Sequence, residues 1–147
     1  MILRWLFASI HLLALGIGLG AVLARARALQ GELDSAGLRR LFAADSWWGV
    51  SAVLWIGTGL ARVLGGMEKS TAYYVQNHVF WAKMALLLVV LLLEIRPMVT
   101  LIRWRVAHRQ GRQPDTHRAR LFARLSYVQA VIIILMVFAA TAMARGI

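Results

Sequence analysis

Residues 73–95, YYVQNHVFWAKMALLLVVLLLEI, decide the fold class, because they form a long apolar run with few polar interruptions. A helix of this length rises about 35 Å at 1.5 Å per residue, which is enough to cross the hydrocarbon core of a bilayer. One residue in the middle of the run, Lys83, carries an amine. A lysine near a bilayer centre costs several kcal/mol on insertion scales, so Lys83 requires a partner or a function.

Three further segments share this apolar character. The chain has 147 residues, of which 61% are hydrophobic, well above the fraction in soluble domains. We predict an all-α integral membrane protein, a four-helix bundle that forms a single transmembrane domain over residues 1–147. Its transmembrane helices are predicted at about residues 5–24, 47–64, 73–95 and 125–144. Cysteine is absent, which excludes disulfides and thiolate metal sites.

The net charge of +11 is concentrated in two connections. Residues 96–124 carry eight arginines and one aspartate, and the connection after the first helix adds Arg25, Arg27, Arg39 and Arg40. With four helices, both basic connections share one side. The positive-inside rule places that side in the cytoplasm, with both termini and the short outer loop outside. We therefore expect a multi-pass protein of the bacterial inner (cytoplasmic) membrane. Its arginines are expected to bind anionic lipid headgroups, and nucleic acid is not expected as a partner.

The connections contain further local signals. Residues 35–44 carry apolar side chains at helical spacing, which predicts a short helix lying on the membrane surface. Asp45 is then expected to cap the second transmembrane helix. Glu94, at the inner end of the third helix, is expected to face water. That helix is predicted to extend into the cytoplasm and to break at Gly111 and Pro114.

Three nitrogen-bearing side chains lie in the outer half of the predicted spans. Measured from the outer helix ends, His11 lies about 10 Å deep, His78 about 8 Å and Lys83 about 15 Å. Facing nitrogen donors at similar depth on two helices are what a haem iron requires. His78 and Lys83 are about 140° apart around one helix, so only one points straight into such a pocket. We expect Lys83 to face the interior. His78 is either the alternative second ligand or part of an aromatic interfacial belt.

Each of these residues also has a structural explanation. A lone membrane histidine is usually satisfied by a hydrogen bond across helices, which would account for His11. Lys83 could remain charged and be held by backbone carbonyls, by Gln129 or by a lipid phosphate. A ligating lysine must instead be a neutral amine, the form that burial favours.

A family resemblance rests on a few short motifs. They are His11, Arg27, the pair Thr58 and Gly59, and Phe80-Trp81-Ala82-Lys83-Met84. Through these residues, roughly residues 5–95 resemble the HemJ-type protoporphyrinogen IX oxidases and their CopD-like relatives. The chain is also similar to an uncharacterised family of small four-helix bacterial membrane proteins. The resemblance implies that His11 and Lys83 are metal ligands of haem b and that Arg27 binds a haem or substrate carboxylate. The implied reaction converts protoporphyrinogen IX to protoporphyrin IX.

Two functions from different classes follow. The first is a haem b-binding membrane redox protein, either similar to protoporphyrinogen oxidase or a quinone-linked oxidoreductase. Its candidate partners are a quinone or porphyrin substrate and a second copy of the chain in a homo-oligomer. The alternative is a non-enzymatic membrane protein whose intramembrane polar residues fix helix packing and whose arginines bind lipid. A visible absorption spectrum separates the two, because only the first predicts a Soret band.

Overall fold

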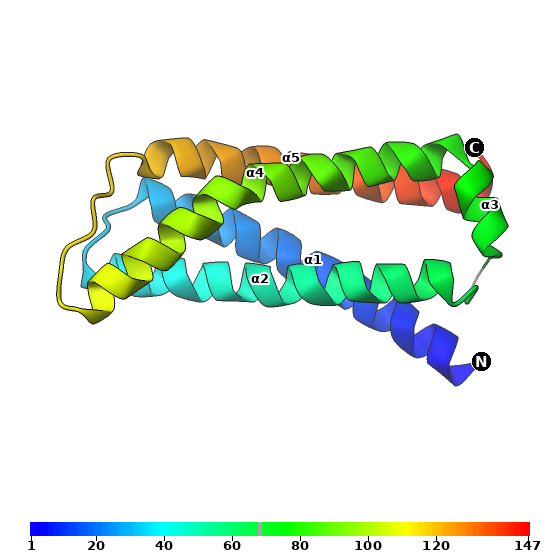
Figure 1. The fold of residues 1–147 in the computed structure, drawn as a ribbon, viewed down its shortest axis with the longest axis horizontal. Coiled ribbons are helices and arrows are strands. Elements are labelled where there is room, and N and C mark those ends of the chain that lie inside the picture. Colours follow the sequence, from blue (N-terminus) through cyan, green and yellow to red (C-terminus); the bar gives the residue numbers. More distant parts are fainter. Residues whose placement is uncertain (68) are drawn as a thin grey trace.

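The computed structural model describes residues 1–67 and 69–147, and these residues form five helices (Figure 1). They are α1 (Ile2–Gln30), α2 (Ser35–Leu64), α3 (Thr71–Gln76), α4 (His78–Arg109) and α5 (Ala119–Arg145). Four are long and apolar enough to cross a membrane, whereas α3 has only 6 residues. The prediction of an all-α protein with four helices of membrane-spanning length is confirmed.

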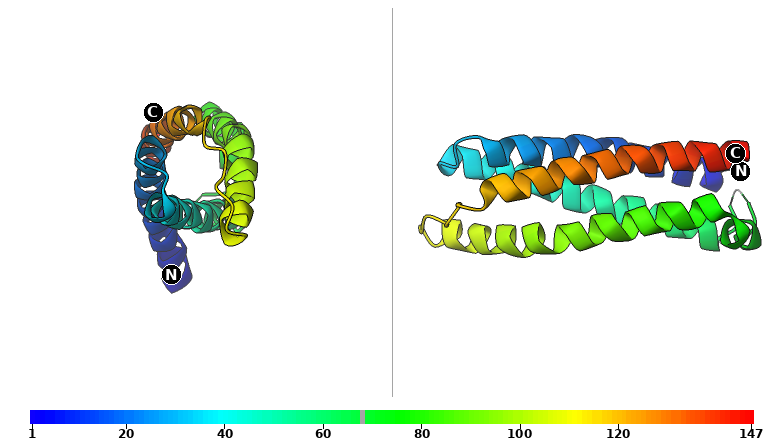
Figure 2. Two further views of the ribbon diagram at one scale, coloured as in Figure 1. Left: turned by 90° about the vertical axis from the view of Figure 1, so that its left-hand side faces the viewer. Right: turned by 90° about the horizontal axis from the view of Figure 1, so that it is seen from above.

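The long helices run up and down, so the bundle has two distinct ends. Both termini and α3 lie at one end, which we call the α3 end (Figures 1 and 2). The connections at residues 31–34 and 110–118 lie together at the other, which we call the arginine-rich end. Residues 31–34 are Gly-Glu-Leu-Asp and carry no arginine, so at this end of the molecule Arg27, Arg39 and Arg40 belong to the adjoining turns of α1 and α2.

The first connection is much shorter than predicted. Residues 35–44, expected to lie on the membrane surface as a separate helix, are the first turns of a continuous α2. Asp34 caps this helix by accepting a hydrogen bond from the main-chain N–H of Gly37 at 2.7 Å. Leu38 and Leu41 are fully buried, so this segment packs inside the bundle. The prediction that Asp45 caps the second helix is therefore wrong.

The predicted helix over residues 73–95 is divided at Asn77. The Asn77 side chain accepts hydrogen bonds from the main-chain N–H groups of Val79 at 2.8 Å and Phe80 at 3.3 Å, which starts α4 one residue later. Tyr73 thus belongs to α3 rather than to the spanning helix. At its other end α4 continues to Arg109, and the chain then turns at a glycine with φ of 71° (Gly111), in agreement with the predicted extension and break.

Two buried clusters hold the long helices together. The cluster in the middle of the bundle includes Val22, Trp48, Trp55, Val90, Ile133 and Met136. The cluster near the arginine-rich end includes Leu29, Leu38, Leu41, Leu101, Trp104 and Phe122. Many outward-facing side chains are apolar and exposed, among them Leu13, Val53, Leu92 and Phe138. Such a surface suits contact with lipid tails rather than water.

The helices are not packed equally around the bundle. Helix α1 packs along α2 and α5, and α4 packs along α5. Helices α2 and α4 meet near the arginine-rich end, where Arg105 donates a hydrogen bond to the Phe42 carbonyl at 2.8 Å. Toward the α3 end these two helices separate, and α3 lies across the gap (Figure 1).

Candidate functional site

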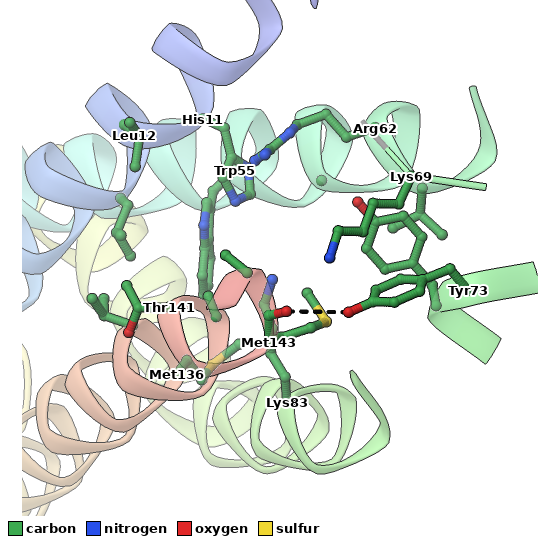
Figure 3. Close-up of a pocket in the computed structure, with 17 residues that line it drawn as sticks. His11, Leu12, Trp55, Arg62, Lys69, Tyr73, Lys83, Met136, Thr141 and Met143 are labelled. Carbon is green, nitrogen blue, oxygen red and sulfur yellow. Dashed lines mark hydrogen bonds between the residues drawn. The ribbon is translucent and has the colours of Figure 1, made fainter. Parts of the chain in front are cut away.

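A cavity of about 430 Å³ lies between the helices at the α3 end (Figure 3). All five helices contribute to its wall. A lobe of about 100 Å³ continues between α2 and α4, and both spaces are lined by His11, Trp55 and Lys83. Small-molecule sites in proteins span about 300–1,000 Å³, so the larger space is of ligand-binding size.

His11 lies in the cavity wall with 9% of its surface exposed. Its Nδ1 atom is 2.9 Å from Oγ1 of Thr58. The Thr58 hydroxyl donates its single proton to the main-chain carbonyl of Leu54 at 2.6 Å, so it accepts from His11. This pattern assigns the proton of neutral His11 to Nδ1 and the lone pair to Nε2. A histidine held in this way by a second residue is prepared to bind a metal through Nε2.

The imidazole of His11 packs against one face of α2. Trp55, Thr58 and Gly59 follow one another at helical spacing, and the Trp55 and His11 rings are 5.9 Å apart between centroids. A Cβ atom at Gly59 would lie 3.2 Å from Cε1 of His11, which is tighter than nine in ten real Cβ contacts. The glycine thus leaves the room that the imidazole occupies.

Trp55 brings an unsatisfied donor to the same wall. Its indole N–H is buried and finds no acceptor in the part of the chain that the structure describes. A buried donor without a partner costs about 1–3 kcal/mol. Because Trp55 lines both the cavity and its lobe, an acceptor on a bound molecule or an ordered water there would offset this cost.

Four residues were candidate ligands or binding residues in the sequence: His11, Arg27, His78 and Lys83. Of these, His11 and Lys83 line the cavity. Lys83 is half-buried on α4 and points into it opposite His11, in agreement with its expected inward orientation (Figure 3). His78 is exposed at the start of α4 and is not among the lining residues. Arg27 is exposed in the last turn of α1, about 24 Å along that helix from His11.

Two lining cations were not expected from the sequence. Arg62 lies one turn after Thr58 on the cavity face of α2 and extends toward His11 (Figure 3). Lys69 Nζ lies 4.0 Å from the ring centroid of Tyr73. A hydrogen bond with Lys69 lowers the pKa of the Tyr73 phenol, and that phenol donates to the Met143 carbonyl at 3.2 Å. The spacing of Arg62 from Trp55 and Thr58 was the signal that could have placed it here.

A second polar group surrounds Arg25, whose side chain is completely buried. Its two terminal nitrogens bind both carboxylate oxygens of Glu94 at 2.7 and 2.8 Å. They also donate to Asp45 at 3.1 Å and to Gln129 at 2.8 Å. The remaining N–H donates to the Ser126 hydroxyl at 3.1 Å. All five N–H groups of this guanidinium therefore have an acceptor.

These contacts extend into a network that joins the four long helices. Asp45 also accepts from Arg105 at 2.9 Å, and Gln129 donates to Glu94 at 2.8 Å. The expectation that Glu94 faces water is wrong, because its carboxylate pairs with Arg25 inside the bundle. Two arginines balance the charge of two carboxylates. The Arg25 network therefore joins the helices by ion pairs and has no excess charge with which to bind a ligand. The sequence signal for this network was the presence of opposite charges inside apolar segments, because such charges are normally paired in a membrane.

The donor groups available decide which kind of metal centre fits. Over residues 1–67 and 69–147, no three His, Cys, Asp or Glu side chains group closely enough to hold a bare metal ion. A haem needs one or two protein ligands, because the porphyrin supplies the other four nitrogens. The imidazole of His11 and the amine of Lys83 on opposite walls of the cavity correspond to that number of ligands.

A family model described as "Predicted membrane protein (DUF2214)" matches residues 3–147, nearly the whole chain. No curated protein and no solved structure matches.

Proposed function

The chain belongs to the DUF2214 family of predicted membrane proteins, and we propose that it binds haem b in the α3-end cavity, where His11 would hold the iron. The observation that carries the proposal is the His11–Thr58 hydrogen bond of 2.9 Å, which orients the imidazole in the cavity wall through its Nδ1 atom. Thr58 in turn is fixed by its bond to Leu54, so ring and tautomer are both held.

Lys83 is the proposed second ligand. Its side chain enters the cavity from α4, on the side opposite His11 (Figure 3). Trp55 and Met136 lie in the apolar wall around them and would keep water from the iron. A ligating lysine must be a neutral amine, so ligation would require Lys83 in that form. His78 remains the alternative, and its exposed position outside the cavity argues against it.

The proposed activity is electron transfer at a membrane-embedded haem. Bound haem b supplies reversible one-electron chemistry at its iron. The electron partner is a lipid-soluble molecule, a quinone or a porphyrinogen. Arg27 has no part in this proposal, because it lies at the opposite end of α1 from His11. We also propose that the α3 end faces outward across a bacterial inner membrane, since the arginines cluster at the other end.

The test is a visible absorption spectrum of detergent-purified protein from haem-supplemented cells, recorded oxidised and after dithionite reduction. We expect a Soret band with sharp reduced α and β bands. His11→Ala should abolish or shift these bands, whereas the exposed control His78→Ala should leave them unchanged. Lys83→Met should convert a low-spin spectrum to a different spin state or ligand set.

Three outcomes would overturn parts of this proposal. A colourless but folded wild-type protein at full haem supply would end it. Bands unchanged in His11→Ala would remove His11 as the ligand, and bands lost only in His78→Ala would move the ligand to His78.

A second candidate is a non-enzymatic membrane protein that organises lipid or a partner. The Arg25 network supports it, because ion pairs between the helices explain the buried charged side chains of this network without a cofactor. The clustered arginines would then bind anionic headgroups. On this alternative, His11→Ala and Lys83→Ala are folded, as stable as wild type, and colourless like it.

A further inference from the structure

We infer that the outer face of α1 and α5, at the arginine-rich end, binds the phosphate of an anionic phospholipid through Arg27, Arg120 and Arg124. We call these three residues the arginine site. The site lies at the opposite end of the bundle from the α3-end cavity, so it does not depend on bound haem. It rests on the second candidate function in taking lipid as the partner of the arginines, and it gives that contact a location.

The depth of two of these arginines follows from the contacts between α1 and α5. The two helices run in opposite directions (Figure 1), and Arg25 on α1 donates a hydrogen bond to Ser126 on α5 at 3.1 Å. Arg27 lies two residues closer to the arginine-rich end than Arg25. Arg124 likewise lies two residues closer to that end than Ser126. Arg27 and Arg124 therefore lie at about the same depth on neighbouring helices.

A second hydrogen bond shows that the arginine site occupies one face. The Tyr127 hydroxyl on α5 donates to Oε1 of Gln30 on α1 at 3.0 Å. Gln30 lies one turn after Arg27 on α1. Tyr127 lies one turn after Arg124 on α5, so both arginines flank this contact. Arg120 lies one further turn along α5 toward the arginine-rich end, and all three arginines are exposed.

The three guanidiniums of the arginine site have no carboxylate partner. The salt bridges near this end of the bundle use the carboxylates of Asp45, Glu94 and Asp115, which pair with other cations. Among residues 1–67 and 69–147, no ion pair involves the three arginines. Arginine binds phosphate through strong, often bidentate, charge-assisted hydrogen bonds. A phosphate placed among three arginines therefore gains attraction from each of them.

The position of Arg124 along α5 indicates that this phosphate belongs to a lipid. Val128 lies one turn after Arg124, and the exposed residues Val131 and Leu135 continue the same side of the helix. This apolar stripe suits contact with lipid tails. Tyr127, half-buried beside it, is of a residue type enriched at the membrane interface. The arginine at the end of the stripe thus lies where headgroup phosphates lie, rather than far out in water.

The charge of the site selects among lipids. Phosphatidylcholine carries a cationic choline next to its phosphate, whereas phosphatidylglycerol carries only the anion. Each arginine near an anionic membrane surface strengthens binding about fivefold. Three arginines on one face therefore favour phosphatidylglycerol over phosphatidylcholine.

The test measures lipid preference beside the arginine site and away from it. Because the chain has no cysteine, Val128→Cys gives a single labelling position next to Arg124. Val50→Cys gives a control label at an exposed apolar position on α2. Each fluorophore-labelled full chain is placed in phosphatidylcholine nanodiscs that contain doxyl-labelled phosphatidylglycerol or doxyl-labelled phosphatidylcholine, and quenching by the two is compared. We expect a preference of at least about tenfold for phosphatidylglycerol at residue 128 and little preference at residue 50.

Variants connect this preference to the named arginines. Arg27→Gln with Arg124→Gln should reduce the preference at residue 128 to that measured at residue 50. Arg39→Gln with Arg40→Gln removes the same charge from two exposed arginines of α2, and it should keep most of the preference. Circular dichroism and thermal unfolding verify that each variant is folded.

Three results would overturn the inference. Equal preference at residues 128 and 50 would mean that anionic lipid gathers diffusely around the protein. Equal loss in the two double variants would mean that net charge, rather than these positions, sets the preference. Release of phosphatidylglycerol by an excess of glycerol phosphate would assign the arginines to a soluble phosphate compound.

The outcomes for the separate proposals are distinguishable. Arg27→Gln with Arg124→Gln should leave any haem spectrum unchanged, because Arg27 lies about 24 Å along α1 from His11. A haem spectrum without local lipid preference would remove the arginine site and keep the haem proposal. Diffuse preference at both labels would remove the arginine site and keep the second candidate function.

Discussion

The guanidinium of Arg25 binds both carboxylate oxygens of Glu94, at 2.7 and 2.8 Å, in the interior of a membrane-spanning bundle. The arginine is on α1 and the glutamate on α4, two helices that each pack along α5. A bidentate pair has a defined geometry, so it sets the rotation and depth of each helix relative to the other.

Breaking this pair should destabilise the bundle strongly. Arg25→Gln leaves Glu94 buried beside Asp45 without its principal cation, and removal of one partner of a buried ion pair costs about 3–5 kcal/mol. Arg27→Gln, two residues further on the same helix but exposed, should change stability by less than about 0.5 kcal/mol. Unfolding of both variants in detergent against denaturant measures the difference.

The paired replacement is a sharper test of the same network. Arg25→Met combined with Glu94→Met removes one charge of each sign and leaves Asp45 paired with Arg105. We expect it to be less destabilising than Arg25→Gln alone, because no uncompensated charge remains. A double variant as unstable as the sum of its single variants would contradict charge balance as the basis of the network.

Removal of the Thr58 hydroxyl should loosen His11. Thr58→Val keeps the shape of the side chain but removes the hydroxyl that accepts from the Nδ1–H group of His11, at a cost of about 1–3 kcal/mol. Thr58→Ser should restore most of the stability. If the haem proposal is correct, the valine variant also shifts the haem reduction potential, which a spectroelectrochemical titration measures. Equal stability of the valine and serine variants would argue against the hydrogen bond.

A pair of glycine substitutions tests the fit of the imidazole against α2. Gly59→Ala places a methyl group 3.2 Å from His11 Cε1, so the ring must move. Gly57→Ala meets nothing within 4 Å and should stabilise the helix by up to about 1 kcal/mol. We expect Gly59→Ala to melt at a lower temperature than Gly57→Ala. Identical melting temperatures would mean that the His11 ring does not pack tightly against Gly59.

The start of α2 offers a local test of the fold. Asp34→Ala removes the acceptor for Gly37 N–H and should cost about 1 kcal/mol, whereas Asp34→Asn should cost much less. Asp115→Ala is a control for loss of an exposed carboxylate elsewhere, since Asp115 lies outside the helices. Thermal unfolding of the three variants decides whether α2 begins at this cap. An Asp34→Ala variant as stable as wild type would favour a helix that begins nearer the membrane.

The candidate site was predictable only in part. Depth and residue type were enough to select His11 and Lys83, because a polar side chain far inside an apolar run is visible in the sequence. Arg62 lies in the last turn of α2, where a cation can reach the membrane interface, so the sequence did not indicate that it lines the cavity. Arg27 was selected through a family resemblance, and the structure places it at the other end of α1.

The sequence by itself determined the helices. In lipid, backbone hydrogen bonds must be made within a segment, so apolar length alone specifies a spanning helix, and Gly111 and Pro114 mark a local break. Tertiary structure decided the partners of the polar side chains. Arg25 pairs with Asp45 and Gln129, which lie 20 and 104 residues away along the chain. Such pairing depends on the rotation and depth at which helices pack, and that is a property of all four helices together rather than of any one segment.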